Sequence, residues 1–175
     1  MKIITKSSKE TKELAQSLGN LLLEEGSQDL IFLAIEGELG AGKTTFVQGL
    51  ARGLGIKEKI LSPTFVLMKS FEIPKSSNHN IRGQIKNFSH PRPIPAREKS
   101  LNLATEGFRH FYHLDCYRLE SYKELNTINF KQILKTNNIV IMEWANKVKK
   151  VLPKKYLKIE IKCLGKNERE ITISW

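Results

Sequence analysis

The chain has 175 residues, of which 40% are hydrophobic, enough for the core of one domain and too many for wholesale disorder. Lysine and arginine outnumber aspartate and glutamate by 29 to 18, and the net charge of +11 fits either an acidic partner or a general bias toward lysine. The 2 cysteines, Cys116 and Cys163, form no CxxC motif, so neither a disulfide framework nor a structural zinc site is expected.

The N-terminal segment predicts a helix. Ser7 and Glu10 have the three-residue spacing of a capping box, and Gly26 is the predicted end of the helix. Between them, leucines recur at helical spacing: Leu14, Leu18, Leu21 and Leu22. Because this segment lacks the apolar stretch of a signal peptide, we expect no export and a cytoplasmic location.

The segment Leu30–Ile35 predicts a strand that is buried on both faces, because apolar residues fill both alternating sets of positions. It is also the longest apolar run, and its 6 residues are too few to span a membrane. A second helix is predicted after Gly42, where apolar residues gather on one face. Gly53 and Gly55 are expected to end it.

Three further short strands are predicted, at residues 65–68, 111–114 and 139–142, and helical pieces at about 122–134 separate the last two. Between the first two strands, the segment of about 72–107 has no periodicity and is rich in Pro, Ser, Asn, His and Lys. Such a composition predicts an irregular basic insert, either a functional loop or a disordered one.

The C-terminal tail predicts a β-hairpin. Residues 157–161 and 171–173 alternate apolar with polar side chains, and Lys166-Asn167 lies between them as a turn. Strands that alternate with helices and end in a hairpin near the sheet edge predict a three-layer α/β fold. We therefore expect one domain over residues 1–175, with a mostly parallel central sheet.

The residues Gly37 to Thr44 read GELGAGKT and match the phosphate-loop pattern G-x-x-x-x-G-K-[ST] at every fixed position. The match lies after a predicted buried strand and before a predicted helix, as the chemistry requires. Glycines let backbone N–H groups converge on phosphate, and the helix N-terminus adds partial positive charge. Lys43 can reach the β- and γ-phosphates, and the Thr44 hydroxyl can take one site on Mg²⁺.

A phosphate loop needs an acid at the end of a neighbouring strand to hold the hydrated Mg²⁺. Asp115 and Glu143 each follow a short apolar segment, and in a parallel sheet these ends share the edge of the phosphate loop. Either acid can polarise or position the attacking water. The alternative for each is that it only caps a following helix.

Four segments occur together in order: GELGAGKTT from Gly37, SPTF from Ser62, HLDCYRL from His113, and EW at Glu143. As a set they resemble the TsaE (YjeE) family, bacterial ATPases of the pathway that makes threonylcarbamoyladenosine in tRNA. The resemblance runs through nearly the whole chain apart from the insert. The phosphate loop by itself would indicate only a superfamily, whereas the other three segments make the resemblance specific.

The resemblance implies a small P-loop α/β fold that binds ATP with Mg²⁺ and hydrolyses it slowly when alone. It also implies that the protein works with TsaD and TsaB, which transfer the threonylcarbamoyl group. The protein would then interact with tRNA only indirectly, through that complex. The family's ATPase cycle is thought to reset the complex between turnovers rather than to perform the transfer.

Site residues carry over by position. Lys43 would hold phosphate and Thr44 would bind Mg²⁺. Asp115 and Glu143 would be the acids near the metal and the γ-phosphate. The catalytic set is then Lys43, Asp115 and Glu143. Residues 62–65 match a switch-like loop. The nucleotide-binding set implied by the resemblance is Thr11, Gly40, Ala41, Gly42, Lys43, Thr44 and Thr45.

Two departures from the family pattern stand out. The connection between SPTF and the HLDCYRL segment is usually much shorter in the family, and the insert of about 72–107 accounts for the difference. Asn146 stands where the family commonly has an acidic residue, so no acid role is expected there, while the metal site is unaffected.

Two other functions compete with this one. A small-molecule kinase would suit the size and the phosphate loop, but such an enzyme needs paired arginines on a lid, and Arg82, Arg92 and Arg97 lie unpaired in the insert. A nucleic-acid-binding ATPase would suit the lysines at 147–158. No aromatic residues interleave with these lysines, however, and a solvated helix face explains them better.

Overall fold

The computed structural model describes residues 1–24, 29–74, 108–135 and 137–175. The strands of this part of the chain are β1 (Lys2–Thr5), β2 (Ile31–Glu36), β3 (Met68–Glu72), β4 (His110–Asp115), β5 (Asn138–Glu143), β6 (Leu157–Cys163) and β7 (Arg169–Ser174). The helices are α1 (Ser8–Glu24), α2 (Lys43–Gly53) and α3 (Phe130–Ile133), with two 3₁₀ helices, η1 (Tyr122–Ile128) and η2 (Ala145–Val151).

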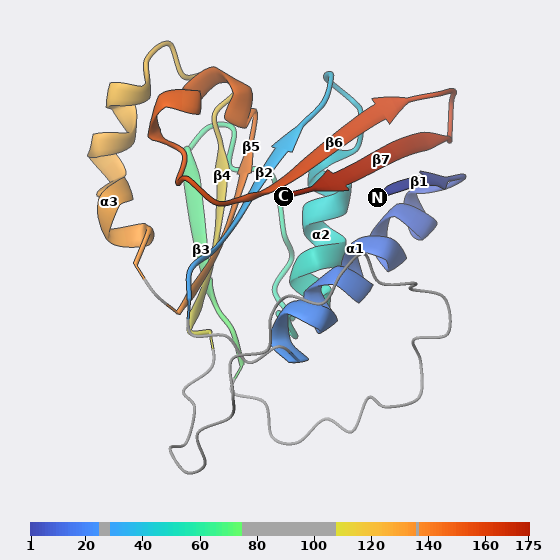
Figure 1. The fold of residues 1–175 in the computed structure, drawn as a ribbon, viewed down its shortest axis with the longest axis horizontal. Coiled ribbons are helices and arrows are strands. Elements are labelled where there is room, and N and C mark those ends of the chain that lie inside the picture. The colour runs from blue at the N-terminus through green and yellow to red at the C-terminus, as the bar shows by residue number, and fades with distance from the viewer. Residues whose placement is uncertain (25–28, 75–107, 136) are drawn as a thin grey trace.

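One mixed sheet contains all seven strands, in the order β1-β7-β6-β2-β5-β4-β3 (Figure 1). The four central strands are parallel, and the strands outside them, β1, β7 and β3, pair antiparallel. In the register, Glu143 of β5 lies between Ile35 of β2 and Asp115 of β4. The predicted α/β fold with a mostly parallel centre is therefore confirmed, and the carboxyl ends of three neighbouring strands lie at one edge.

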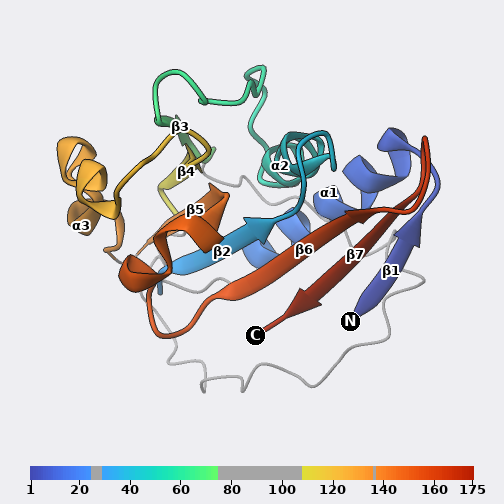
Figure 2. The same ribbon diagram turned by 90° about the horizontal axis from the view of Figure 1, so that it is seen from above.

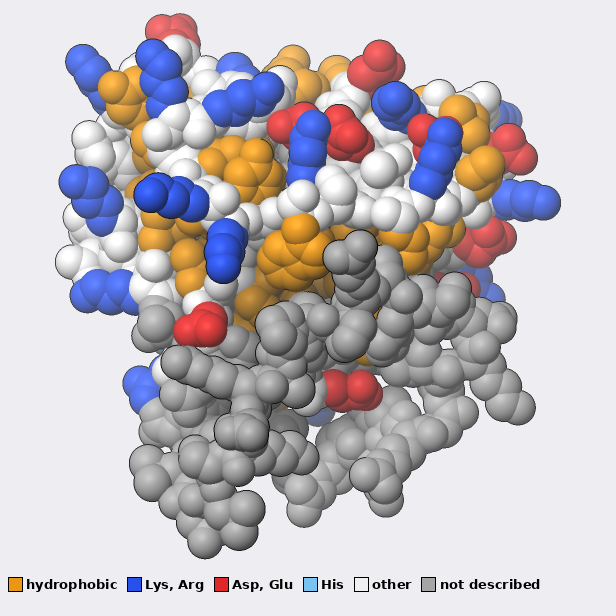
Figure 3. Space-filling model, viewed as in Figure 1, with side chains coloured by type: hydrophobic (Ala, Val, Ile, Leu, Met, Phe, Trp, Pro, Cys, Tyr) orange, Lys and Arg blue, Asp and Glu red, His pale blue; other side chains and the backbone are white. Residues whose placement is uncertain are grey.

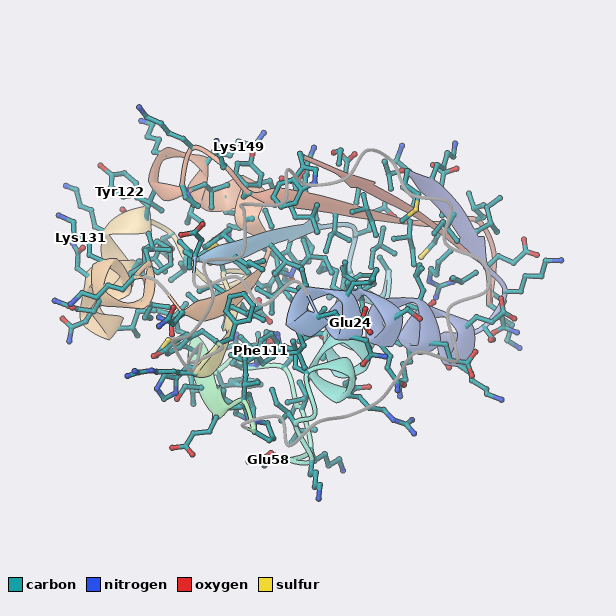
Figure 4. All side chains as sticks on the ribbon, turned by 60° about the horizontal axis from the view of Figure 1, so that its bottom comes forward. Glu24, Glu58, Phe111, Tyr122, Lys131 and Lys149 are labelled. Atoms are coloured by element: carbon teal, nitrogen blue, oxygen red, sulfur yellow. The ribbon has the colours of Figure 1, made fainter. Side chains whose placement is uncertain are left out.

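Helices cover both faces of the sheet, which is why the central strands are apolar throughout. In β2, Leu33 and Ile35 belong to the core under α1 and α2, whereas Phe32 and Ala34 belong to the core under α3, η1 and η2. Figure 2 shows α1 and α2 together on one side of the strands. In Figure 4, Phe111 lies in the interior and Lys131 at the periphery on α3, and Phe111 belongs to the core under α1 and α2.

Two strands differ from the sequence expectation. The prediction of a strand at residues 65–68 is wrong, because β3 starts only at Met68. Before it, the Val66 N–H bonds to the Pro63 carbonyl in a turn, and Leu67 has a left-handed φ of 65°. Strand β1 was not expected, because four residues show too little pattern; it lies beside β7, so the confirmed C-terminal hairpin is one strand in from the edge.

The predicted helix caps are confirmed only in part. The Ser7 hydroxyl accepts the Glu10 N–H at 3.1 Å, but the Glu10 carboxylate accepts the N–H of Lys6 rather than that of Ser7. Helix α2 includes Gly53, and Gly55 follows it with a left-handed φ of 79°. The predicted stop at Gly26 and residues 75–107 of the predicted insert lie outside the described residues.

Glycines let α1 and α2 approach each other at backbone distance. A Cβ atom built on Gly49 of α2 would lie 2.3 Å from the Lys12 carbonyl oxygen and 2.9 Å from the Ala15 Cβ of α1. A Cβ on Gly53 would lie 2.2 Å from the Gln16 carbonyl oxygen. Because the obstructing atoms are mostly backbone, neither helix can accommodate a larger residue here without shifting.

We expect Gly49→Ala to lower the free energy of unfolding by about 1–3 kcal/mol, the usual range for overpacking. Alanine favours the helix by roughly 1 kcal/mol over glycine. A lower stability of Gly49→Ala would therefore show that the close contact with α1 outweighs helix propensity. Urea unfolding of both proteins measures the change. The matched control is Gly165→Ala, where an added Cβ meets no atom within 4 Å. An unfolding midpoint for Gly49→Ala at or above the wild-type value would contradict this account.

Candidate functional site

The glycine-rich loop joins β2 to α2, and its backbone requires glycine at two positions. A Cβ at Gly37 would lie 2.5 Å from the Ile161 carbonyl oxygen, so the loop can pass β6 only with glycine there. Gly42 precedes α2 with φ 101°, a left-handed value that side chains disfavour. The first N–H groups of α2 have no partner within the helix, and this end carries partial positive charge.

A cavity of about 410 Å³ lies in front of this loop. Residues from three parts of the chain line it: the phosphate loop and the start of α2, the SPTF loop, and the ends of β4 and β5. The lining residues are Leu39, Gly40, Gly42, Lys43, Thr44, Thr45, Ser62, Thr64, Asp115, Tyr117, Glu143 and Trp144. Its volume is within the range of small-molecule sites.

Lys43 is held inside the loop. Its Nζ donates to the carbonyl oxygens of Gly37 at 2.9 Å and Glu38 at 2.8 Å, and it lies 3.9 Å from the centre of the Trp144 ring. Burial lowers the pKa of Lys43, while the charges of Glu143 and Asp115 act in the opposite direction. The ammonium group is therefore positioned at the cavity and partly desolvated, where its attraction for an anion is stronger than in water.

Glu143 ends β5 and is 2% exposed. Its carboxylate accepts the Thr44 hydroxyl at 3.0 Å and faces His113 Nε2 at 2.9 Å. His113 is fully buried on β4, and its Nδ1 has no hydrogen-bond partner among the described residues. Because a carboxylate only accepts, the contact is a hydrogen bond in the tautomer that carries a proton on Nε2. One signal for the contact between His113 and Glu143 was present in the sequence. His113 and Asp115 are two apart on a predicted strand and therefore share a face, and the register pairs Asp115 with Glu143.

Asp115 ends β4 and connects the SPTF loop to the site. Its Oδ2 accepts hydrogen bonds from Ser62 at 2.7 Å and Thr64 at 2.5 Å, and its Oδ1 accepts the Tyr117 N–H at 2.9 Å. The turn that displaces the predicted strand at residues 65–68 thus presents two hydroxyl groups to the acid. Residue pairing alone could not predict these bonds, because they join positions 51 and 53 residues apart.

Aromatic side chains form one wall of the cavity. Trp144 has a left-handed φ of 59°, and its ring lies 5.0 Å from that of Tyr117. Beside them, the Arg118 guanidinium lies 4.1 Å from the centre of the Phe65 ring, which is 81% exposed. Arg118 therefore neither lines the cavity nor pairs with a carboxylate in the described part of the chain.

The predicted site residues are brought together with two exceptions. Ala41 is fully buried with its side chain in the core, and its N–H bonds to the Glu38 carbonyl. Thr11 does not line the cavity either: its hydroxyl bonds to Thr5 at 2.8 Å and to the Ser7 carbonyl at 3.1 Å. A role for Thr11 beside the nucleotide base stays a prediction from the resemblance.

A second hollow, of about 710 Å³, shares no residue with the first. It lies between α1, the end of α2 and residues 55–60, and its charged lining residues are Lys12, Arg52, Lys57, Glu58 and Lys59. It holds no acid besides Glu58 and no residue of the phosphate loop. On the face drawn in Figure 3, basic side chains are scattered among acidic and apolar ones rather than gathered in one patch.

The described residues also bear on metals, thiols and membranes. No group of three or more metal-binding side chains occurs among them, and Cys116 and Cys163 are both free. Burial raises the pKa of the Cys116 thiol to about 12, so it stays protonated beside Asp115. In this part of the chain, no helix is both long and apolar enough to cross a bilayer.

A buried strand, a glycine-rich loop and a helix, with two acids at the ends of neighbouring parallel strands, define a P-loop protein of the α/β class. The family model for "Threonylcarbamoyl adenosine biosynthesis protein TsaE" matches residues 5–81 and 100–171. The chain therefore belongs to the TsaE family, as the resemblance predicted.

Similar proteins agree with this assignment. The chain is 30% identical over 174 residues to the tRNA threonylcarbamoyladenosine biosynthesis protein TsaE of Treponema pallidum, covering 99% of this chain and 100% of that one. It is 32% identical over 142 residues to the protein of the same name from Bacillus subtilis, covering 81% and 68%. The crystal structure of Bacillus subtilis YdiB matches with a TM-score of 0.61 at 28% identity, covering 99% and 83%.

Proposed function

We propose that this protein binds ATP with Mg²⁺ and hydrolyses it in the cytoplasm, in support of the TsaB–TsaD pair that forms threonylcarbamoyladenosine in tRNA. The family's role in threonylcarbamoyl adenosine biosynthesis supports the assignment of this protein to that pathway. One observation carries the chemistry: a single cavity is lined by the phosphate loop, the first residues of α2 and both predicted acids. The Lys43 ammonium group and the N–H groups at the start of α2 suit the phosphates, and the two acids suit a metal and water.

The triphosphate would lie along residues 40–45. Lys43 Nζ now bonds to two carbonyl oxygens, which are neutral acceptors, and a phosphate oxygen is a stronger, charged one. We therefore expect the ammonium group to exchange these carbonyls for phosphate. Trp144 lies under Lys43, so its ring would keep water from one side of the ion pair.

The residues at the cavity fit Mg²⁺. This ion is commonly bound by one or two carboxylates together with substrate phosphates and waters, so the lack of a three-residue cluster in the described chain is compatible with it. Thr44, Asp115 and Glu143 would hold it, directly or through water. When bound, Mg²⁺ neutralises charge on the phosphates.

Glu143 is the acid that we assign to the attacking water. Asp115 already accepts three hydrogen bonds, two on Oδ2 and one on Oδ1. Glu143 makes its two short bonds through Oε1, and Oε2 accepts only a longer bond of 3.3 Å from the same Thr44 hydroxyl. Oε2 therefore has acceptor capacity left to orient a water or to take its proton.

The kinase alternative has no supporting observation in the described residues. Arg82, Arg92 and Arg97 lie outside them, no arginine lines the cavity within them, and Arg118 stacks on Phe65 instead.

The deciding experiment follows the labelled γ-phosphate of ATP, first with the protein alone and then with TsaB, TsaD, tRNA and an activated threonylcarbamoyl donor. We expect the protein alone to release the label slowly as inorganic phosphate. We expect the full mixture to modify tRNA faster than the same mixture without this protein. Transfer of the label to a small acceptor would contradict the proposal.

A further inference from the structure

Arg169 connects two segments that lie far apart in the sequence. It is the first residue of β7 and is half-buried, and its Nε donates to the carbonyl oxygen of Ala41 at 2.9 Å. Ala41 is in the centre of the phosphate loop, 128 residues earlier. Nothing in the sequence pattern indicated this contact.

The other end of the guanidinium is fixed as well. Its Nη1 donates to the carbonyl oxygens of Gly165 at 3.0 Å and Glu168 at 2.9 Å, both in the turn between β6 and β7. A planar guanidinium with donors on two sides has little freedom once three carbonyls hold it. Arg169 is therefore held in place by contacts within the protein itself.

The contact with Ala41 determines the direction of the next N–H group. The peptide bonds in the described chain are trans, so the Ala41 carbonyl and the Gly42 N–H point in opposite directions. Arg169 does not line the cavity, whereas Gly42 does. The bond to Arg169 thus turns the carbonyl away from the cavity and the Gly42 N–H toward it.

Glycine gives this peptide more than one accessible orientation. Gly42 has φ 101° and no Cβ, so its own backbone does not restrict the Ala41–Gly42 peptide as that of a larger residue would. A flipped peptide would aim a carbonyl oxygen at the phosphates and repel them. A restraint on that carbonyl is therefore valuable at this position.

We propose that Arg169 is a positioning residue for the phosphate loop, holding the Ala41–Gly42 peptide so that the Gly42 N–H faces the bound phosphates. The proposal rests on the function proposed above and adds a residue from the C-terminal hairpin to that site. Arg169 itself does not contact the nucleotide. Its alternative role is to fasten the hairpin turn, which would affect stability but not nucleotide affinity.

The experiment compares the wild-type protein with Arg169→Met and Arg169→Lys. Titration calorimetry gives the Kd for ADP with Mg²⁺, and phosphate release gives KM and kcat for ATP. We expect Arg169→Met to raise the Kd and KM about tenfold, the effect of losing one well-oriented hydrogen bond to the phosphates. The kcat should stay within about twofold, because the loop holds the phosphates equally in the ground and transition states.

The two variants and one control separate the possible outcomes. Arg169→Lys keeps the charge and can reach Ala41 or the turn but not both, so we expect a smaller rise in Kd from a protein that still folds. Arg52→Met, at the exposed end of α2, should bind ADP like the wild type. The backbone N–H resonance of Gly42 should shift when ADP binds to the wild type and should shift less in Arg169→Met.

Folded Arg169 variants with the wild-type Kd would overturn the inference and leave the proposed function intact. If Arg169→Met does not fold, an unchanged Kd in Arg169→Lys overturns it in the same way. A wild-type protein that binds no ADP would instead overturn the proposed function, so the two failures are distinguishable.

Discussion

Replacing Lys43 by alanine is expected to weaken the binding of ATP and ADP about a hundredfold, an effect consistent with the loss of charge-assisted hydrogen bonds to phosphate. Lys43 supplies the only ammonium group among the residues that line the described cavity. Because it is 5% exposed and already lies at the cavity, little ordering is needed when phosphate binds. The N–H groups of the loop and α2 remain in the variant, but they carry only partial charges.

Titration calorimetry with ADP and Mg²⁺ measures this loss, and circular dichroism shows whether the variant is folded. The matched control is Lys12→Ala, which removes an exposed lysine from the second hollow and should leave the Kd unchanged. Lys43→Arg should not restore binding, because the larger guanidinium cannot occupy the space between the loop and the Trp144 ring. Wild-type affinity in Lys43→Ala would mean that the nucleotide binds elsewhere.

Replacing Glu143 by glutamine should lower kcat for ATP hydrolysis by about a hundredfold or more, the usual contribution of a general base. Nucleotide affinity should change much less. Glutamine has nearly the same shape and keeps one oxygen that can accept a hydrogen bond from Thr44 or His113, so the loop should stay in place. It cannot take a proton from water, and its NH₂ group is a donor where an acceptor is needed.

Single-turnover phosphate release and ADP titration on the same preparation separate the two effects. Glu58→Gln is the control, since Glu58 is an exposed acid on the second hollow. If Glu143→Gln loses affinity and turnover to the same extent, Glu143 is a structural support for Thr44 and not the residue that activates water.

The sequence predicted the parts of this site that depend on local pattern. The spacing of GELGAGKT specifies a loop, and the apolar runs before Gly37, Asp115 and Glu143 identify buried strands whose ends had to coincide if the strands were parallel. The register confirms this reasoning, because Glu143 pairs with both Ile35 and Asp115. Local pattern and parallel topology were sufficient to place the loop and both acids together.

The parts that the sequence did not predict depend on contacts between distant segments. Ser62 and Thr64 reach Asp115 only because the chain turns at Pro63 and Leu67 takes a left-handed φ, while β-branched and aromatic residues nearby suggested a strand. Arg169 and Ala41 carry no shared pattern at all. Tertiary contacts determined the conformation in both cases, and single-sequence periodicity contains no information about them.

The most direct test of this account is a crystal structure of the protein with a non-hydrolysable ATP analogue and Mg²⁺. We expect the phosphates to lie within hydrogen-bonding distance of Lys43 Nζ and of the N–H groups of residues 42–45. Nζ should have left the carbonyl oxygens of Gly37 and Glu38. An analogue found in the hollow beside Lys12 and Arg52, or Lys43 still bonded to its own loop with the analogue bound, would contradict it.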